Sequence, residues 1–173
     1  MNNSSKKATN PANTAVNRRR TLSRLMAIQI SYQYDFLEDE KELEEMKDDI
    51  IENYTLDSEE DTKSYRKEID ETFLNNLITG LTHNYDEIDG EIANFLKETW
   101  SLESLDDVLI QILRCGTFEL KNFQDIPAKV IIDEYVDITA SFFDDKKITF
   151  ANAMLDGLAK HFRKEEFNKP IAE

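Results

Sequence analysis

The 173-residue sequence has few of the residues that end helices, form tight turns or bind metals. It contains one cysteine, two histidines, three prolines and four glycines. A single cysteine excludes an internal disulfide, and neither His83 nor His161 has a cysteine or a second histidine at metal-ligand spacing. No Asn-Gly or Asp-Gly pair stands between alternating polar and apolar residues, as a β-hairpin would require. These absences favour an all-α protein, and we expect no metal and no other cofactor.

Motifs of common enzymes are missing as well. There is no phosphate-binding loop, no Gly-rich dinucleotide turn and no Gly-x-Ser-x-Gly elbow. Carboxylates are abundant, but acid–base catalysis needs a partly desolvated pair, which an exposed acidic run does not supply. Cys115 lies in an apolar stretch and is interpreted as buried packing, not as a nucleophile. From the missing motifs we expect that the protein is not an enzyme. Residues 1–16 contain no apolar run that could serve as a signal peptide or membrane span, so we expect a soluble, cytoplasmic protein.

Charge is unevenly distributed along the chain, whose net charge is -15. Residues 1–33 contain six lysines and arginines and no acid, whereas residues 34–71 contain 17 acids and five bases. At physiological ionic strength the field of a charge decays over roughly 8 Å, so a basic segment can act independently of a distant acidic one. The acidic balance of the whole chain therefore does not exclude a local contact with nucleic acid.

The first helix is predicted over about residues 20–35, because apolar residues recur there at helical spacing. A helical projection separates one broad apolar side from a narrow stripe with Arg20 and Arg24, which we expect to face solvent. Continued backwards, the helix would turn Arg18 and Arg19 toward the apolar side, so both are expected on a flexible basic arm. The broad side consists of Leu22, Leu25, Met26, Ile28, Gln29, Ile30 and Tyr32, and the stripe consists of Arg20, Arg24, Ala27 and Ser31.

The rest of the chain also follows the helical period. Apolar residues lie on all sides of a helix predicted over residues 105–113, so we expect it to be the buried central helix, begun by a capping box of Ser104 and Asp107. Pro127 suits the first turn of a later helix. Further helices are predicted around residues 73–81, 88–96, 127–138 and 150–162.

The acidic stretch over residues 38–64 has few apolar residues to anchor it. We interpret it as a solvated insertion, partly helical at Leu43, Met46 and Ile50, that ends in a mobile loop. The alternative interpretation is that this acidic segment has a regulatory role and mimics the charge of RNA. The predicted organisation is a disordered basic arm over residues 1–17, one helical domain over residues 18–164 and a polar tail over residues 165–173.

The clearest functional signal is the cluster of arginines at residues 18–20 and 24, beside amide and aromatic residues. Guanidinium groups suit phosphates through bidentate hydrogen bonds, and single-stranded RNA is held by backbone charge together with base stacking. Basic runs are also common on solvated arms. The residue pattern by itself therefore leaves RNA binding and a solvated helix start as open alternatives.

Two stretches together resemble the NusB family of bacterial transcription antitermination factors. The first is "RTLSRLMAIQISYQ", and the second is "ILRCGTFEL" followed by "IPAKVIIDEYVDI" and "FANAMLDGLAK". The resemblance covers about residues 18–36 and 72–162, and the order and spacing of its pieces make it specific. The matching residues are Arg20, Arg24, Ala27, Gln29, Tyr32, Gln33, Leu113, Arg114, Glu119, Leu120, Pro127, Lys129, Val130, Ile132, Glu134, Phe150, Asn152, Leu155 and Asp156.

The resemblance implies an all-helical fold of two packed halves and a non-catalytic role. Proteins of this family bind the boxA element of nascent ribosomal RNA together with NusE, a small-subunit ribosomal protein, and help RNA polymerase in the antitermination complex read through terminators. It also implies RNA contacts for the basic cluster, Gln29, Phe150 and Asn152, and a partner-facing side. The expected RNA-binding residues are Arg18, Arg19, Arg20, Arg24, Gln29, Lys146, Phe150 and Asn152, and the expected partner-binding residues are Tyr32, Asp107 and Arg114.

The sequence departs from the family pattern at several positions. Leu109 and Ile110 stand where the family often has a charged pair, Ala153 replaces a usual glycine, and Lys146 stands where an acid is common. A lysine at that position favours RNA. Two other classes of function stay open: an RNA-binding domain separated from an RNA cytosine methyltransferase, which carries a similar helical domain, and a protein-interaction module that has lost RNA binding.

Overall fold

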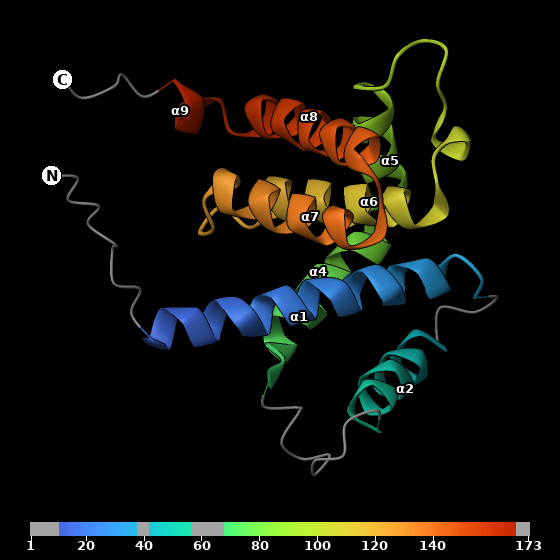
Figure 1. The fold of residues 1–173 in the computed structure, drawn as a ribbon. Coiled ribbons are helices and arrows are strands. Elements are labelled where there is room, and N and C mark those ends of the chain that lie inside the picture. Colours follow the sequence, from blue (N-terminus) through green and yellow to red (C-terminus); the bar gives the residue numbers. More distant parts are fainter. Residues whose placement is uncertain (1–10, 38–41, 57–67, 169–173) are drawn as a thin grey trace, which may run out of the picture.

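The computed structural model describes residues 11–37, 42–56 and 68–168, and these ranges contain helices and no strand (Figure 1). The prediction of an all-α fold is confirmed. No helix in the described ranges is long and apolar enough to cross a bilayer. The elements are α1 (Pro11–Tyr34), α2 (Glu42–Leu56), α4 (Glu71–His83), α5 (Tyr85–Ala93), the short 3-10 helix η2 (Leu102–Ser104), α6 (Asp107–Asn122), α7 (Ala128–Phe142), α8 (Asp145–Phe162) and α9 (Lys164–Phe167).

Helix α6 lies at the centre of the molecule, in contact with α1, α4, α5, α7 and α8 (Figure 1). Eleven of its 16 residues are buried, so the predicted buried central helix is confirmed. Its start differs from the predicted capping box. Asp106 is the N-cap and accepts a hydrogen bond from the Val108 N–H at 3.0 Å, whereas Ser104 ends η2. The cap is local, because an Asp side chain satisfies an N–H that has no partner in the first helical turn.

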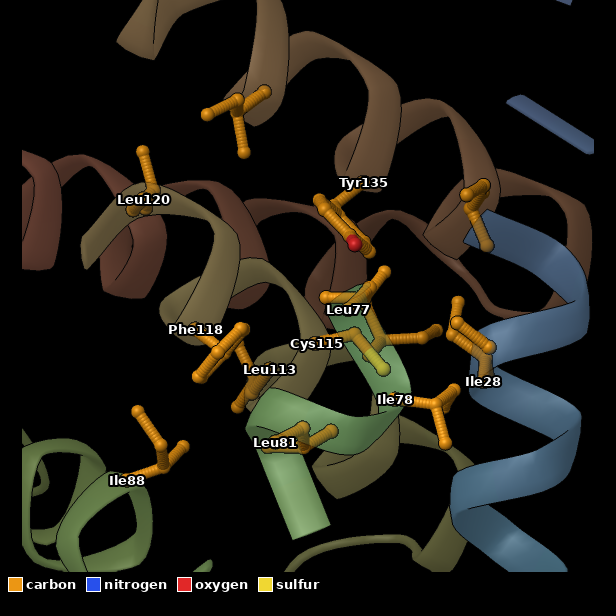
Figure 2. Close-up of a cluster of buried hydrophobic side chains, with 14 of the residues drawn as sticks. Ile28, Leu77, Ile78, Leu81, Ile88, Leu113, Cys115, Phe118, Leu120 and Tyr135 are labelled. Atoms are coloured by element: carbon orange, nitrogen blue, oxygen red, sulfur yellow. The ribbon is translucent and has the colours of Figure 1, made fainter. Parts of the chain in front are cut away.

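Apolar side chains of α1, α4, α6 and α7 meet in one core cluster (Figure 2). The cluster includes Tyr135 and Cys115, both fully buried. Burial raises the pKa of the Cys115 thiol well above its ordinary value, so the thiol stays protonated. The interpretation of Cys115 as core packing is confirmed.

The predicted segment boundaries need two corrections, at the basic arm and at the polar tail. α1 begins at Pro11, so Arg18 and Arg19 lie within a helix and not on an arm, whereas residues 1–10 lie outside the described residues. The prediction that the acidic segment 38–64 is partly helical at Leu43, Met46 and Ile50 is confirmed, since α2 lies there and packs on α1 through these three buried residues. The end of that segment falls outside the described residues. Within the predicted polar tail, α9 continues to Phe167.

Arg163, directly after α8, joins this part of the chain to the end of α6. Its buried guanidinium donates hydrogen bonds to the carbonyl oxygens of Leu120 at 2.7 Å and Phe123 at 2.9 Å. Nearby, the Glu166 carboxylate accepts a hydrogen bond from the N–H of Ala128 at 3.0 Å. Backbone groups at the end of α6 and at the beginning of α7 have no partner within their own helices. The segment after α8 supplies hydrogen-bond partners for them.

Candidate nucleic-acid and protein interface

Helix α1 is buried over more of its circumference than its sequence predicts. Met26, Ile28 and Ile30 of the apolar side are buried as expected, but the stripe predicted to face solvent also faces the core. Arg24, Ala27 and Ser31 are buried, with exposed fractions of 2 %, 0 % and 0 %. Leu22, Leu25 and Tyr32, on the side predicted to be buried, are partly exposed, and Gln29 is exposed. The expectation that Arg24 lies on an exposed stripe is therefore wrong. The polar stripe is compatible with the core because its polar groups find partners there.

Arg24 forms the centre of a buried ionic network between α1, α6 and α7. Its Nε donates to one oxygen of Glu119 at 3.0 Å and its Nη2 donates to the other, and Nη1 donates to Glu134 at 3.1 Å. The Tyr135 hydroxyl also donates to Glu119, at 2.9 Å. Burial alone would lower the pKa of Arg24, but the hydrogen bond and negative charge of Glu119 raise it above its ordinary value. Arg24 is thus a fixed cation that holds α1 in place and does not reach the surface.

A second polar network holds the other end of α1. The Gln111 amide donates to Asp35 at 2.7 Å, and the Arg114 guanidinium donates to Asp35 and to Asp89 at 2.8 Å each. Arg114 also lies over the ring of Tyr85, 4.5 Å from its centroid. Burial alone would lower the pKa of Arg114, but the hydrogen bond and charge of Asp89 raise it. Arg114 is therefore paired within the chain, with 12 % of its side chain exposed, and its contact with a partner stays a prediction.

Three arginines form a basic face at the N-terminal half of α1, beside the beginning of α4. Arg18 and Arg19 are exposed, and Arg19 donates a hydrogen bond to the carbonyl of Ile69 at 2.8 Å. Arg20 lies 3.5 Å from the Asp70 carboxylate, with its guanidinium over the ring of Phe73 at 5.4 Å. These contacts reduce the freedom of two long side chains, which lowers the entropy that they lose on binding an anion.

An apolar groove lies farther along the same helix. Its volume is about 380 Å³ and its lining comes from α1, α6 and α7. Phe142, at the end of α7, is 55 % exposed. Tyr32 lines this groove, whereas Asp107 is exposed at the start of α6, next in sequence to Val108 of the lining. Leu109 and Ile110 are buried and do not contribute to its surface. The lining residues are Leu25, Met26, Ile28, Gln29, Tyr32, Val108 and Phe142.

A salt bridge fixes the α6 and α8 ends next to this groove. Lys147 lies 3.2 Å from the Asp106 carboxylate and 4.5 Å from the ring centroid of Phe143. Partial burial would raise the pKa of Asp106, but the hydrogen bonds from Lys147 and from the N–H of Val108 lower it below its ordinary value. The beginning of α8 is therefore held beside Val108.

The three predicted RNA-binding residues of α8 do not share one face. Lys146 and Asn152 are exposed, and Phe150 is partly buried against Trp100, with ring centroids 5.4 Å apart. Successive helical residues turn by about 100°, so Phe150 and Asn152, two positions apart, point to nearly opposite flanks of the helix. Lys146 precedes Phe150 by four positions and lies on its flank. Phe150 and Asn152 therefore lie on different flanks of α8, and their contact with RNA stays a prediction.

Val108, Phe142 and Trp100 were not predicted from the sequence as surface residues. Each is an apolar residue at or beyond the end of a helix, and an apolar residue there is as readily part of the core as of a surface. The signal that separates the two cases is exposure, which depends on the packing of distant helices. Among the described residues no group of three or more His, Cys, Asp or Glu side chains is placed to hold a metal ion.

Together the fold and these surfaces define an all-helical binding domain with a basic helix end and an adjacent apolar groove. Residues 21–160 match the NusB family, and the chain belongs to that family. A transcription antitermination protein NusB of Rhizobium etli is 36 % identical over 167 residues, which cover 94 % of this chain and 98 % of the relative. The NusB of Rhizobium rhizogenes is 36 % identical over 155 residues, 90 % of this chain and 93 % of that protein.

Solved structures agree with this assignment. The structure of T. maritima NusB is 32 % identical, superposes with a TM-score of 0.67, and the alignment covers 86 % of this chain and 96 % of that one. A structure described as antitermination factors NusB and NusE in complex with dsRNA gives a TM-score of 0.65 at 22 % identity, over 84 % of this chain and 98 % of the other. At that identity the second likeness supports the fold.

Proposed function

We propose that this chain is a transcription antitermination factor that binds boxA-type RNA of nascent ribosomal RNA transcripts together with NusE. In this role it helps RNA polymerase read through terminators, and it acts in the cytoplasm as a binding protein and not as an enzyme. Two things support the proposal: the relatives with 36 % identity are named transcription antitermination proteins, and the two surfaces of α1 suit the two partners.

The observation that carries the proposal is that one helix presents both surfaces. The basic face lies at residues 18–20, and Gln29 and Tyr32 line the groove on the same 24-residue helix. Ten residues of helix separate Arg19 from Gln29, a rise of about 15 Å. A strand of RNA on the basic face therefore lies close to a protein in the groove, so each partner can strengthen the binding of the other.

The residues divide between the partners as follows. Arg18, Arg19 and Arg20 bind phosphates, since a guanidinium donates two parallel hydrogen bonds to a phosphate group. Gln29 lines the groove and is the residue of its α1 lining that we assign to RNA. Lys146, Phe150 and Asn152 of α8 remain proposed RNA contacts, on two flanks of that helix. Tyr32 and Asp107 face NusE, and Arg24 supports binding only by holding α1 against α6 and α7.

Charge reversal on the basic face tests the proposal. Binding of a labelled boxA-like RNA to the chain is measured by fluorescence anisotropy over a salt series, with and without NusE. Three neutralised phosphates predict a slope of log affinity against log salt of roughly -2, from about -0.7 per phosphate on single strands. The double variant Arg18→Glu, Arg19→Glu is expected to bind more weakly and with a flatter slope, and NusE is expected to tighten binding by the wild type.

The matched control reverses two exposed cations at the other end of the chain, with Lys160→Glu and Lys164→Glu. It changes the net charge by the same amount and is expected to keep most of the affinity and the slope. Equal losses in both double variants would attribute the effect to net charge and remove the basic face from the proposal. A wild-type chain that binds boxA-like RNA neither alone nor with NusE would overturn the proposed function.

A further inference from the structure

Two aromatic rings of the segment after α5, which lie beside one flank of α8, are in contact with solvent. Trp100, in the segment after α5, is 47 % exposed and packs on Phe150 with ring centroids 5.4 Å apart and an angle of 36° between the rings. Farther along the flank, Phe95 is 37 % exposed and lies edge-on to His161 at 5.8 Å. The segment after α5 lies along α8, because the ring of Phe95 is also close to Gly157.

The exposed indole keeps apolar surface area in contact with water. Burying an aromatic side chain removes a large apolar area from water, so a half-exposed tryptophan on a rigid neighbour leaves that gain available to a ligand. The position of the ring is set by packing on Phe150, which α8 fixes. Trp100 is therefore an ordered flat surface with one side open.

Lys146 lies toward the Trp100 end of this flank, where Glu98 and Glu103 are also exposed. Lys146 is exposed one turn before Phe150, and surface residues four positions apart on a helix are neighbours. At the far end Glu91 lies 3.8 Å from His161, so the carboxylate is at the end away from Trp100. The open face of the indole thus lies at the end of the flank that carries the lysine.

We propose that Trp100 and Phe150 form a stacking platform for an unpaired base of single-stranded RNA, with Lys146 placed to bind a neighbouring phosphate. This inference rests on the proposed function and adds Trp100 to it. A flat aromatic surface beside a cation is the combination that holds single strands, because every base has a face that can stack and every nucleotide has a charge. A duplex cannot use the platform, since its bases already stack on one another.

Trp100 is the only tryptophan of the chain, so its fluorescence reports directly on the platform. The full chain is titrated with unlabelled boxA-like RNA, and with an abasic ribose-phosphate strand of the same length, while indole emission and its quenching by acrylamide are followed. We expect the RNA to quench the emission saturably and to shield the indole from acrylamide. The abasic strand keeps the phosphates and is expected to do neither.

Substitutions then measure the contribution of stacking to affinity. Trp100→Ala is expected to weaken RNA binding by roughly 5- to 100-fold, and Trp100→Phe by less, because a phenyl ring still stacks. Phe167→Ala removes another exposed ring, on α9, and is the matched control, expected to leave RNA affinity unchanged. Circular dichroism confirms that each variant keeps the helical fold.

The outcomes separate this inference from the proposed function. RNA that binds with the predicted salt dependence, but leaves the Trp100 emission and the affinity of Trp100→Ala unchanged, would overturn the platform and leave the proposed function standing. If Trp100→Ala keeps its RNA affinity and loses affinity for NusE, the platform is a protein contact and the inference is wrong. Absence of any RNA binding by the wild type would overturn both.

Discussion

Arg24 and Glu119 form a two-point hydrogen-bonded ion pair across the contact between α1 and α6, with side chains that are 2 % and 0 % exposed. Glu134 and Tyr135 add hydrogen bonds from α7, so three helices meet at one carboxylate–guanidinium cluster. Buried charges are tolerated only where partners replace water. This network determines which side of α1 faces the core, and hence which side is left for partners.

Removal of the Arg24 side chain is expected to destabilise the fold strongly. Arg24→Ala leaves the Glu119 carboxylate buried without its cation, a change that costs about 3–5 kcal/mol in such sites. Urea unfolding followed by circular dichroism gives the free energy of unfolding. Arg18→Ala, on the exposed basic face of the same helix, is the control and is expected to change it by no more than about 0.5 kcal/mol. Equal stability of the two variants would contradict the structural role of Arg24.

The helical period of α1 and the burial of Met26, Ile28 and Ile30 could be predicted from the sequence, but the burial of the polar stripe could not. Periodicity shows which residues share a side, and the stripe with Arg24 and Ser31 is the more polar one. Its burial depends on Glu119 and Glu134, which lie 95 and 110 residues away along the chain. A projection of one helix does not contain such partners. The buried state of α6 was predictable because that helix is apolar on all sides and needs no distant partner to explain it.

Truncation of an aromatic ring in the groove is expected to weaken binding of NusE. Tyr32→Ala and Phe142→Ala each remove a large ring from the groove lining, and aromatic residues at the centre of an interface contribute about 2 kcal/mol, or roughly 30-fold in affinity. Isothermal titration calorimetry with NusE measures the loss. Val130→Ala removes an exposed apolar side chain near the opposite end of α7 and is expected to stay within about twofold. Full NusE affinity in both ring variants would place the partner elsewhere.

Among the predicted binding residues, too, some positions could be predicted from the sequence and others could not. Tyr32, expected from the resemblance to face the partner, lines the groove together with Val108 because α1 packs on α6. Arg114 was also expected to face the partner; in the structure it is paired with Asp35 and Asp89, and its partner contact stays a prediction. Trp100 was missed because its segment is irregular, and no periodicity indicates which way an irregular segment faces.

Two glycines are expected to respond in opposite ways to alanine. A Cβ atom at Gly116 would lie 2.8 Å from Leu155 Cδ2 and 3.2 Å from Tyr135 Cδ2, both in the packed core, so Gly116→Ala should destabilise by about 1–3 kcal/mol. A Cβ atom at Gly90 meets nothing within 4 Å. Because glycine in a helix is less favourable than alanine by about 0.5–1 kcal/mol, Gly90→Ala should stabilise by that amount. Thermal unfolding of both variants checks the sign, and a shift of the melting temperature in the same direction would refute the close contact at Gly116.

The salt bridge of Asp106 with Lys147 should make a small part of the stability depend on pH. The pKa of Asp106 is lower in the folded chain than in the unfolded one. Its contribution to stability is therefore present above the unfolded pKa of about 3.9 and is lost as the pH falls through the folded pKa.

Asp106→Asn keeps a good N-cap for α6 but removes the charge. Because the pair is largely exposed, the variant should lose no more than about 0.5 kcal/mol at pH 7, and the difference from the wild type should shrink as the pH falls below about 3.9. Urea unfolding across this pH range measures the difference, with Asp137→Asn, an exposed carboxylate of α7, as the control. A loss that is the same at pH 7 and pH 3 would show that Asp106 acts only through its cap and not through Lys147.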